Sequence, residues 1–196
     1  GELMYISFFC GSEMTNRWFI LGLLFITRIS LGFQFQTMGS TSDKVIYELA
    51  LNYAEIGTLI GLFMLPGLFL AIPAGLAGTF FSDKALIGFG LIALSLGGTI
   101  AGLSQGFGFL SVGRVICGIG FVVSTIFFAK VLIDWFEGKE LATAMSVLVM
   151  SWPFGIAMGQ VGHGWLSAFL DWRWAFYIAS LYCAVSAALM ILLYRG

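Results

Sequence analysis

Six long apolar runs dominate the chain and restrict the folds that are open to it. They cover Trp18–Met38, Tyr53–Gly78, Ala85–Ser104, Phe109–Leu132, Leu141–Leu166 and Trp174–Tyr194. A helix needs about 20 mostly apolar residues to cross the hydrocarbon core of a bilayer. Because unpaired backbone groups are very unfavourable in lipid, such spans must be helices. The sequence therefore predicts an all-α transmembrane protein, a six-helix bundle with no extramembrane domain.

The composition indicates a lipid bilayer as the main partner of the chain. Hydrophobic residues make up 60% of the sequence and charged residues 10%, whereas a soluble domain has about 25% charged residues. The net charge of -1 gives no reason to expect a nucleic-acid partner. The three cysteines lack metal-ligand spacing, and we expect neither a metal nor a cofactor.

Residues 1–16 stand apart from the six runs. Met14 lies just before the first run and has the appearance of a natural start, and the chain itself begins with glycine. The apolar patch Met4–Cys10 is too short to span and lacks the basic flank of a signal peptide. We predict that residues 1–16 are a leader or a non-native N-terminus and that residues 17–196 form the six-span unit.

Lysine and arginine are distributed unequally between the two sides of the predicted bundle. Cytoplasmic loops of membrane proteins carry an excess of these residues. One side has Lys44 and Arg173, and the other has Arg17, Lys84, Lys130, Lys139 and Arg195. The asymmetry predicts a multi-pass protein of the cell (inner) membrane with both termini in the cytoplasm.

An internal repeat relates the first three spans to the last three. The pairs that match at an offset of 86 or 87 residues are Arg28 with Arg114, Phe35 with Phe121, Pro66 with Pro153, and Gly75 with Gly162. The repeats cover about residues 17–104 and 105–196. Because each repeat has three spans, the second enters the membrane from the opposite side, as in the inverted repeats of many secondary transporters.

Arg28 and Arg114 are the candidate substrate-binding cations. An arginine at mid-depth costs at least about 2.5–3.5 kcal/mol on insertion scales and indicates a function. All ten Asp and Glu residues lie in loops or at span ends, so none lies at this depth. Water, backbone carbonyls, a partner chain or an anionic solute must balance the charge, and the guanidinium fork matches a carboxylate well. The alternative is that both arginines clamp neighbouring helices, and a packing or gating role fits Arg114 equally well.

Helical spacing places further candidates beside these arginines. Residues at i, i+4 and i+7 share one face of a helix, which groups Arg28 with Phe35 and Arg114 with Phe121. We therefore predict Phe35 and Phe121 as aromatic walls of a site for a small anion, with Gln36 as an additional hydrogen-bond donor. His163, near the end of the fifth run, is interpreted as a packed residue.

Three motifs make the chain resemble the N-terminal half of a major facilitator superfamily transporter. The fourth run contains R-x-x-x-G-x-G as Arg114, Gly118 and Gly120, and Trp135–Glu140 resembles the entry into the fifth span. Gly155 and Gly159, which follow Pro153, resemble the glycine pattern of that span. In the loop before the third span Gly75 and Lys84 match the family, but Thr79 replaces its acidic residue. We expect gating or packing roles for Gly75, Lys84, Gly118, Gly120, Pro66, Pro153, Gly155 and Gly159.

The resemblance implies transport by alternating access between two six-span halves. It therefore implies a partner, either a missing C-terminal half or a second chain, because we interpret this chain as incomplete. The arginine in the first span and the texture of the sequence are similar to anion porters and to permeases of the cyanate/nitrate type. The rival interpretations are an intramembrane enzyme, a channel, and a six-span structural or regulatory subunit. A single histidine and the lack of a mid-span acid argue against an enzyme.

Overall fold

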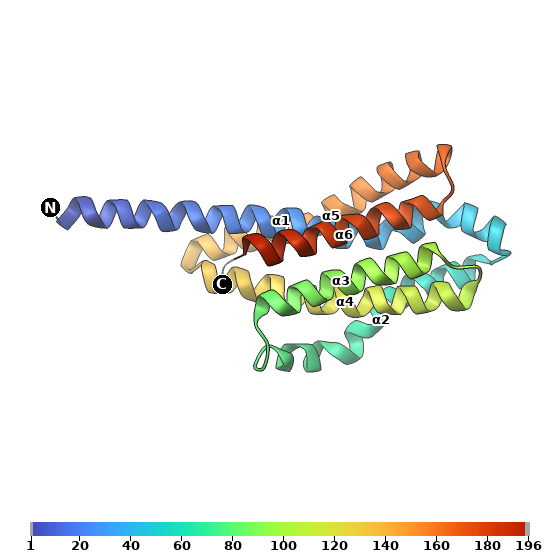
Figure 1. Cartoon of the computed structure of the whole chain (residues 1–196), viewed down its shortest axis with the longest axis horizontal. Coiled ribbons are helices and arrows are strands. Elements are labelled where there is room, and N and C mark those ends of the chain that lie inside the picture. Colours follow the sequence, from blue (N-terminus) through green and yellow to red (C-terminus); the bar gives the residue numbers. More distant parts are fainter. Residues whose placement is uncertain (1, 195–196) are drawn as a thin grey trace.

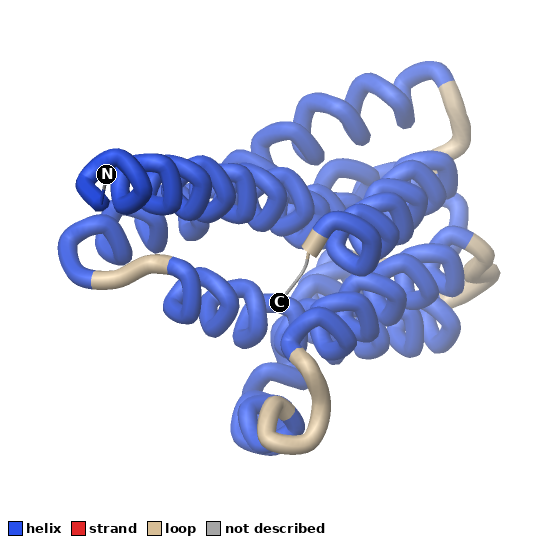
Figure 2. Tube along the Cα trace, turned by 60° about the vertical axis from the view of Figure 1, so that its left-hand side comes forward, coloured by secondary structure: helices blue, strands red, loops and turns tan. Residues whose placement is uncertain are grey.

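Six helices make up the computed structural model, which describes residues 2–194 and contains no strand among them (Figure 1). They are α1 (Glu2–Leu49), α2 (Tyr53–Ala77), α3 (Asp83–Gly102), α4 (Phe107–Trp135), α5 (Gly138–Phe169) and α6 (Arg173–Leu193). Each contains a segment that is long and apolar enough to cross a membrane. Short loops join them, as Figure 2 shows. The predicted all-α transmembrane fold is confirmed.

The two ends of the bundle are named here after one residue at each. The Lys84 end contains the turns at residues 78–82 and 136–137. The Glu48 end contains the turns at residues 50–52, 103–106 and 170–172. At the Glu48 end, Asn52 caps α2, because its side chain accepts from the Glu55 amide at 2.9 Å while the Glu55 carboxylate accepts from the Asn52 amide at 2.8 Å.

Helix α1 is longer than the predicted first span. The sequence placed a break at residues 40–52, and this prediction is wrong because the helix continues to Leu49. Polar residues do not end it, since the Thr41 hydroxyl donates to the Thr37 carbonyl at 2.7 Å and the Ser42 hydroxyl to the Gly39 carbonyl at 3.1 Å. Val45 is fully buried and holds the extension against the core. Residues 2–16 are also helical and extend beyond the bundle in Figure 1; their interpretation as a leader or non-native N-terminus stays a prediction.

The packing of the helices follows the sequence repeat. Helix α1 packs on α5, and α2 packs correspondingly on α4. In the same way α3 packs on α4 while α6 packs on α1, and α3 and α6 pack on each other. Exchanging α1–α3 with α4–α6 reproduces this set of contacts. The structure therefore confirms the prediction of two inverted three-helix repeats.

Glycines allow the repeats to approach closely at two related crossings. A methyl group on Gly32 would collide with the Trp152 carbonyl oxygen in α5, and one on Gly155 would collide with the Ile29 carbonyl oxygen in α1. At the related crossing of α4 and α2, a methyl on Gly118 would collide with the Phe63 carbonyl oxygen and lie 2.8 Å from Pro66. These contacts agree with the packing roles expected for Gly118, Gly155 and Pro66.

The remaining residues predicted for packing or gating differ in their surroundings. Gly120 lies at the crossing of α4 with α3, and a methyl on Gly159 would lie 2.9 Å from the Gln36 side chain. A methyl on Gly75 would meet no atom within 4 Å, so close helix packing does not explain that glycine. Pro153 lies inside α5 with an exposed side chain. Gating roles for Gly75, Pro153 and Lys84 stay predictions.

Candidate functional site

Arg28 extends from α1 to α5 and is only partly buried. Its Nη1 donates to the Leu148 carbonyl at 2.6 Å and to the Ser151 hydroxyl at 3.1 Å. The Nε atom is buried and has no hydrogen-bond partner. The ion pairs found among residues 17–194 involve other side chains, so no described carboxylate neutralises Arg28. Arg28 is thus a partly buried cation in the first span with unused donor capacity.

Arg114 is fully buried and uses all three of its nitrogen atoms. Its Nε donates to the Leu59 carbonyl at 3.2 Å, Nη1 to the Thr37 hydroxyl at 3.5 Å, and Nη2 to the Phe35 carbonyl at 3.2 Å. Its Cζ atom lies 4.6 Å from the centre of the Phe63 ring and 5.8 Å from that of Phe35, within cation–π distance. This geometry favours the clamping alternative for Arg114, because it joins α4 to α1 and α2.

The two arginines share one type of contact, a hydrogen bond to a backbone carbonyl, and differ in whether a guanidinium nitrogen is left without a partner. Arg28 of α1 donates to a backbone carbonyl of α5, and Arg114 of α4 donates to a backbone carbonyl of α2. Under the repeat these helix pairs are equivalent. Only Arg28 keeps partial exposure and an unpartnered nitrogen. The structure thus distinguishes two residues that the sequence presents as alike.

Four aromatic side chains from four helices form a closed ring of contacts, here named the aromatic box. Phe35 lies 5.2 Å from Phe63 and 5.3 Å from Trp152 between ring centres, and Phe121 lies 5.4 Å from Phe63 and 4.8 Å from Trp152. The structure therefore brings the predicted Phe35 and Phe121 together with Arg114. Sequence reasoning missed both Phe63 and Trp152. Phe63 is one of 20 phenylalanines in the chain, and Trp152 joins the box through contacts with other helices, which helical spacing within α5 does not reveal. The available signal was their position, since each shortly precedes a repeat-related proline of α2 or α5.

Gln36 lies at the crossing of α1 and α5, beyond the box toward the Glu48 end. Its amide donates to the Gln160 side chain, and the Ser40 hydroxyl also contacts Gln160 at 3.3 Å. The structure therefore gives Gln36 a partner within the protein. His163 is buried and its Nε2 lies 2.9 Å from the Phe33 carbonyl. This agrees with the interpretation of His163 as a packed residue.

At the Lys84 end, Thr79 stands where the family has an acidic residue, and Asp83 is an acidic residue nearby in the chain. Asp83, the first residue of α3, binds Lys130 of α4 at 2.6 and 2.7 Å, and Asp134 lies 3.8 Å from the same ammonium. Lys84 lines a small hollow beside this pair, together with Tyr194. The ion pair ties the start of α3 to the last turns of α4.

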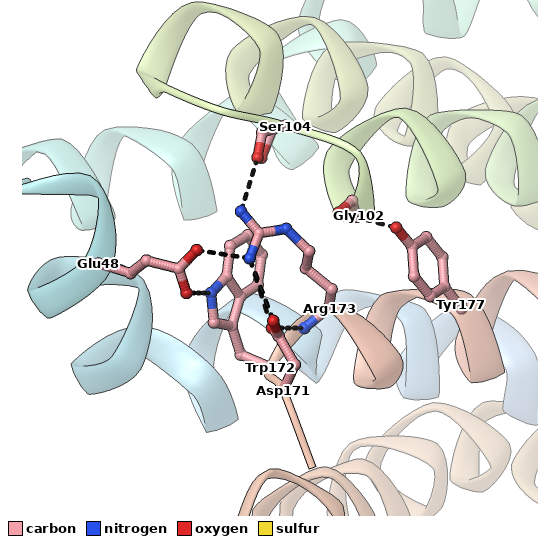
Figure 3. Close-up of polar contacts among 7 residues, drawn as sticks. All are labelled: Glu48, Gly102, Ser104, Asp171, Trp172, Arg173 and Tyr177. Carbon is pink, nitrogen blue, oxygen red and sulfur yellow. Dashed lines mark hydrogen bonds and ion pairs between the residues drawn. The ribbon is translucent and has the colours of Figure 1, made fainter.

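Arg173 joins the end of α1 to two turns at the Glu48 end, as Figure 3 shows. Its Nη1 donates to Glu48 at 2.5 Å and to Asp171 at 3.3 Å, and its Nη2 donates to the Ser104 carbonyl at 3.2 Å. The Trp172 indole donates to the second oxygen of Glu48 at 2.7 Å, and the guanidinium lies 4.5 Å from that indole. The end of α1, the α3–α4 turn and the α5–α6 turn are thereby held together.

Glu48→Gln is expected to loosen this end of the bundle without unfolding it. The neutral amide loses the charge that Arg173 binds and can accept only one of the two hydrogen bonds, a loss of about 1–2 kcal/mol for partly exposed charged groups. Amide hydrogen exchange in residues 44–49 should become about tenfold faster. Asp43→Asn on the same helix is the control. Equal exchange in both variants would show that the Glu48 contacts hold nothing in place.

The fold and the site together define half of an inverted-repeat membrane transporter fold. Six spans, repeats of three helices and charged groups near the repeat interface are the features of that class. The chain matches the Major Facilitator Superfamily over residues 18–196, and it belongs to that family.

Relatives with curated names support the same assignment. The chain is 36% identical over 143 residues to the probable sphingolipid transporter spinster homolog 1 of Arabidopsis thaliana. This match covers 70% of this chain and 28% of the relative. It is 24% identical over 181 residues to the probable galactarate/D-glucarate transporter of Bacillus subtilis. This match covers 87% of this chain and 39% of the relative. The chain thus spans well under half the length of these relatives.

Solved structures show the same fold at low sequence identity. A bacterial homolog of the human lysosomal transporter Spinster, in an inward-facing and occupied conformation, superposes with a TM-score of 0.76 at 20% identity. The match covers 92% of this chain and 44% of that one. The peptide transporter POT in complex with alafosfalin gives a TM-score of 0.75 at 15% identity, covering 87% of this chain and 37% of that one.

Proposed function

We propose that the chain forms the N-terminal half of a secondary active transporter that moves a small anionic solute by alternating access. A C-terminal six-span half or a second chain completes the transporter. Membership of the Major Facilitator Superfamily supports the transport reaction, and the relatives compared carry transporter names. The lysine and arginine asymmetry supports an orientation with the Lys84 end in the cytoplasm.

The surroundings of Arg28 carry the proposal of an anion. The guanidinium stays charged at any physiological pH. Its two contacts in α5 are to a carbonyl and a hydroxyl, neither of which is charged. A charge at this depth is most favourable when an opposite charge accompanies it. The Arg28 side chain is partly exposed, and a carboxylate or another oxyanion that reaches it supplies the missing opposite charge and accepts charge-assisted hydrogen bonds from the guanidinium.

Arg28→Gln is the test of this proposal in the full-length protein reconstituted in liposomes. The amide retains hydrogen bonding toward α5 but removes the charge, and uptake of labelled carboxylates should fall by at least about tenfold, the equivalent of one charge-assisted hydrogen bond. Arg28→Lys keeps the charge without the fork and should retain part of the uptake. Lys139→Gln, an exposed charge at the Lys84 end, serves as the control.

Two results would contradict the proposal. Uptake equal to that of the unmodified protein in Arg28→Gln would exclude Arg28 as the solute ligand. Loss of membrane-inserted protein rather than of uptake would instead favour the alternative function, a six-span subunit with a structural or regulatory role.

A further inference from the structure

The aromatic box lies next to the residues that hold Arg28. Ser151 accepts a hydrogen bond from Arg28, and the next residue in α5 is Trp152. The Trp152 ring reaches Phe35 and Phe121 at 5.3 and 4.8 Å between ring centres. Phe35 in turn lies two helical turns after Arg28 on the same face of α1, about 10 Å along the axis. A guanidinium and an aromatic surface are therefore neighbours in this half of the protein.

The box is held in place from one side and remains accessible in part. Phe63 is fully buried, whereas Phe35, Phe121 and Trp152 are only partly buried. The tilted and edge-on arrangements of these rings are the ones that aromatic pairs prefer. Arg114 lies against Phe63 and Phe35 and hydrogen-bonds the Phe35 backbone. The clamp made by Arg114 thus fixes the rings while three of them keep free surface.

We propose that the transported anion carries an aromatic or similarly flat apolar group close to its charge. Arg28 binds the anionic group, and the box, chiefly Phe35, Phe121 and Trp152, binds the flat group. This inference rests on the proposed anion function and goes beyond it by naming a class of solute. A small inorganic anion would use Arg28 and leave the free aromatic surface without a ligand. A flat apolar group matches that surface in both polarity and shape.

A matched pair of ligands tests the inference with the full-length protein in detergent. The probes are 3-phenylpropanoate and propanoate, which share the carboxylate and differ in the ring. The phenyl compound should bind at least about tenfold more tightly, as expected for one buried ring with aromatic contacts. In Trp152→Leu and in Phe121→Leu the ratio of the two affinities should fall toward one. Trp165→Leu is the control, because Trp165 lies on the same helix with 69% exposure.

The outcomes separate this inference from the proposal on which it rests. Equal affinities for the two carboxylates, or an unchanged ratio in both box variants, would overturn the inference and leave the anion site standing. Arg28→Gln should weaken both ligands by a similar factor. If neither carboxylate binds the unmodified protein, the anion function fails and the inference fails with it. Each variant is compared only as a monodisperse sample, and the second box variant replaces the first if one does not fold.

Discussion

Gly120→Val is expected to prevent the stable assembly of α3 with α4. A methyl group at Gly120 would collide with the Gly90 carbonyl oxygen and lie 2.8 Å from the Leu94 amide nitrogen. Both atoms belong to the backbone of α3, so no side-chain rotation can relieve the contact. The two helices would have to separate, and we expect a loss of about 3 kcal/mol or more, at the upper end for overpacked sites.

The prediction is checked by size-exclusion chromatography and thermal unfolding of the purified protein. Gly120→Val should give aggregated protein or a clearly lower Tm. Gly61→Val is the matched control, because a methyl group at Gly61 of α2 meets no atom within 4 Å. Both substitutions place a β-branched residue in a helix, so they share the same change in helix propensity. Equal Tm values would mean that α3 and α4 do not approach as closely as the structure shows.

Arg114→Lys is expected to destabilise the protein more than Arg114→Met does. Lysine keeps a buried charge but cannot reproduce three hydrogen bonds in three directions, nor the stacking on Phe63. Leaving a buried charge poorly partnered costs about 3–5 kcal/mol. Methionine removes the charge. The carbonyls of Phe35 and Leu59 would lose Arg114 as a donor, but both lie inside helices, where backbone amides also donate to carbonyls. The apolar variant should therefore lose less, about 1–3 kcal/mol for the lost bonds.

The order of the variants distinguishes a clamp from a solute ligand. Thermal unfolding should rank the unmodified protein first, Arg114→Met second and Arg114→Lys last. At Arg28, which keeps an unpartnered nitrogen, we expect the opposite preference, with lysine retaining more uptake than an uncharged residue. If Arg114→Lys proved as stable as the unmodified protein, the clamp formed by Arg114 would be disproved.

The sequence was sufficient to predict the architecture because the bilayer imposes strict rules on length and polarity. Each of the six apolar runs corresponds to one helix. The rare residues that recur at one offset, such as Arg28 and Arg114, indicated the inverted relation between the two three-helix repeats. The end of α1 was predicted wrongly for a local reason. Thr41 looked like a loop residue, but its hydroxyl binds the preceding turn and lets the helix continue.

The grouping of the candidate site residues could be predicted only where a single helix determines it. The position of Phe35 two turns after Arg28 follows from the period of a single helix. The different burial of the two arginines does not, because Thr37 and Leu59, which surround Arg114, lie far from it in the sequence. Trp152 entered the box for the same reason, through a contact between α5 and α4. Contacts between helices decide which of two similar residues stays available to a ligand.

The exchange of partners between the repeats has a consequence for synthesis in the cell. Helix α1 finds its main neighbour in α5, and the contacts of Arg28 lie 120 and 123 residues further along the chain. When α1 first leaves the ribosome, neither Leu148 nor Ser151 has been translated. Newly inserted α1 therefore carries Arg28 in the membrane without its partners in α5. Until α5 is inserted, we expect water defects or the insertion machinery to solvate this charge. The first repeat can therefore complete its packing only after α5 of the second repeat has been inserted.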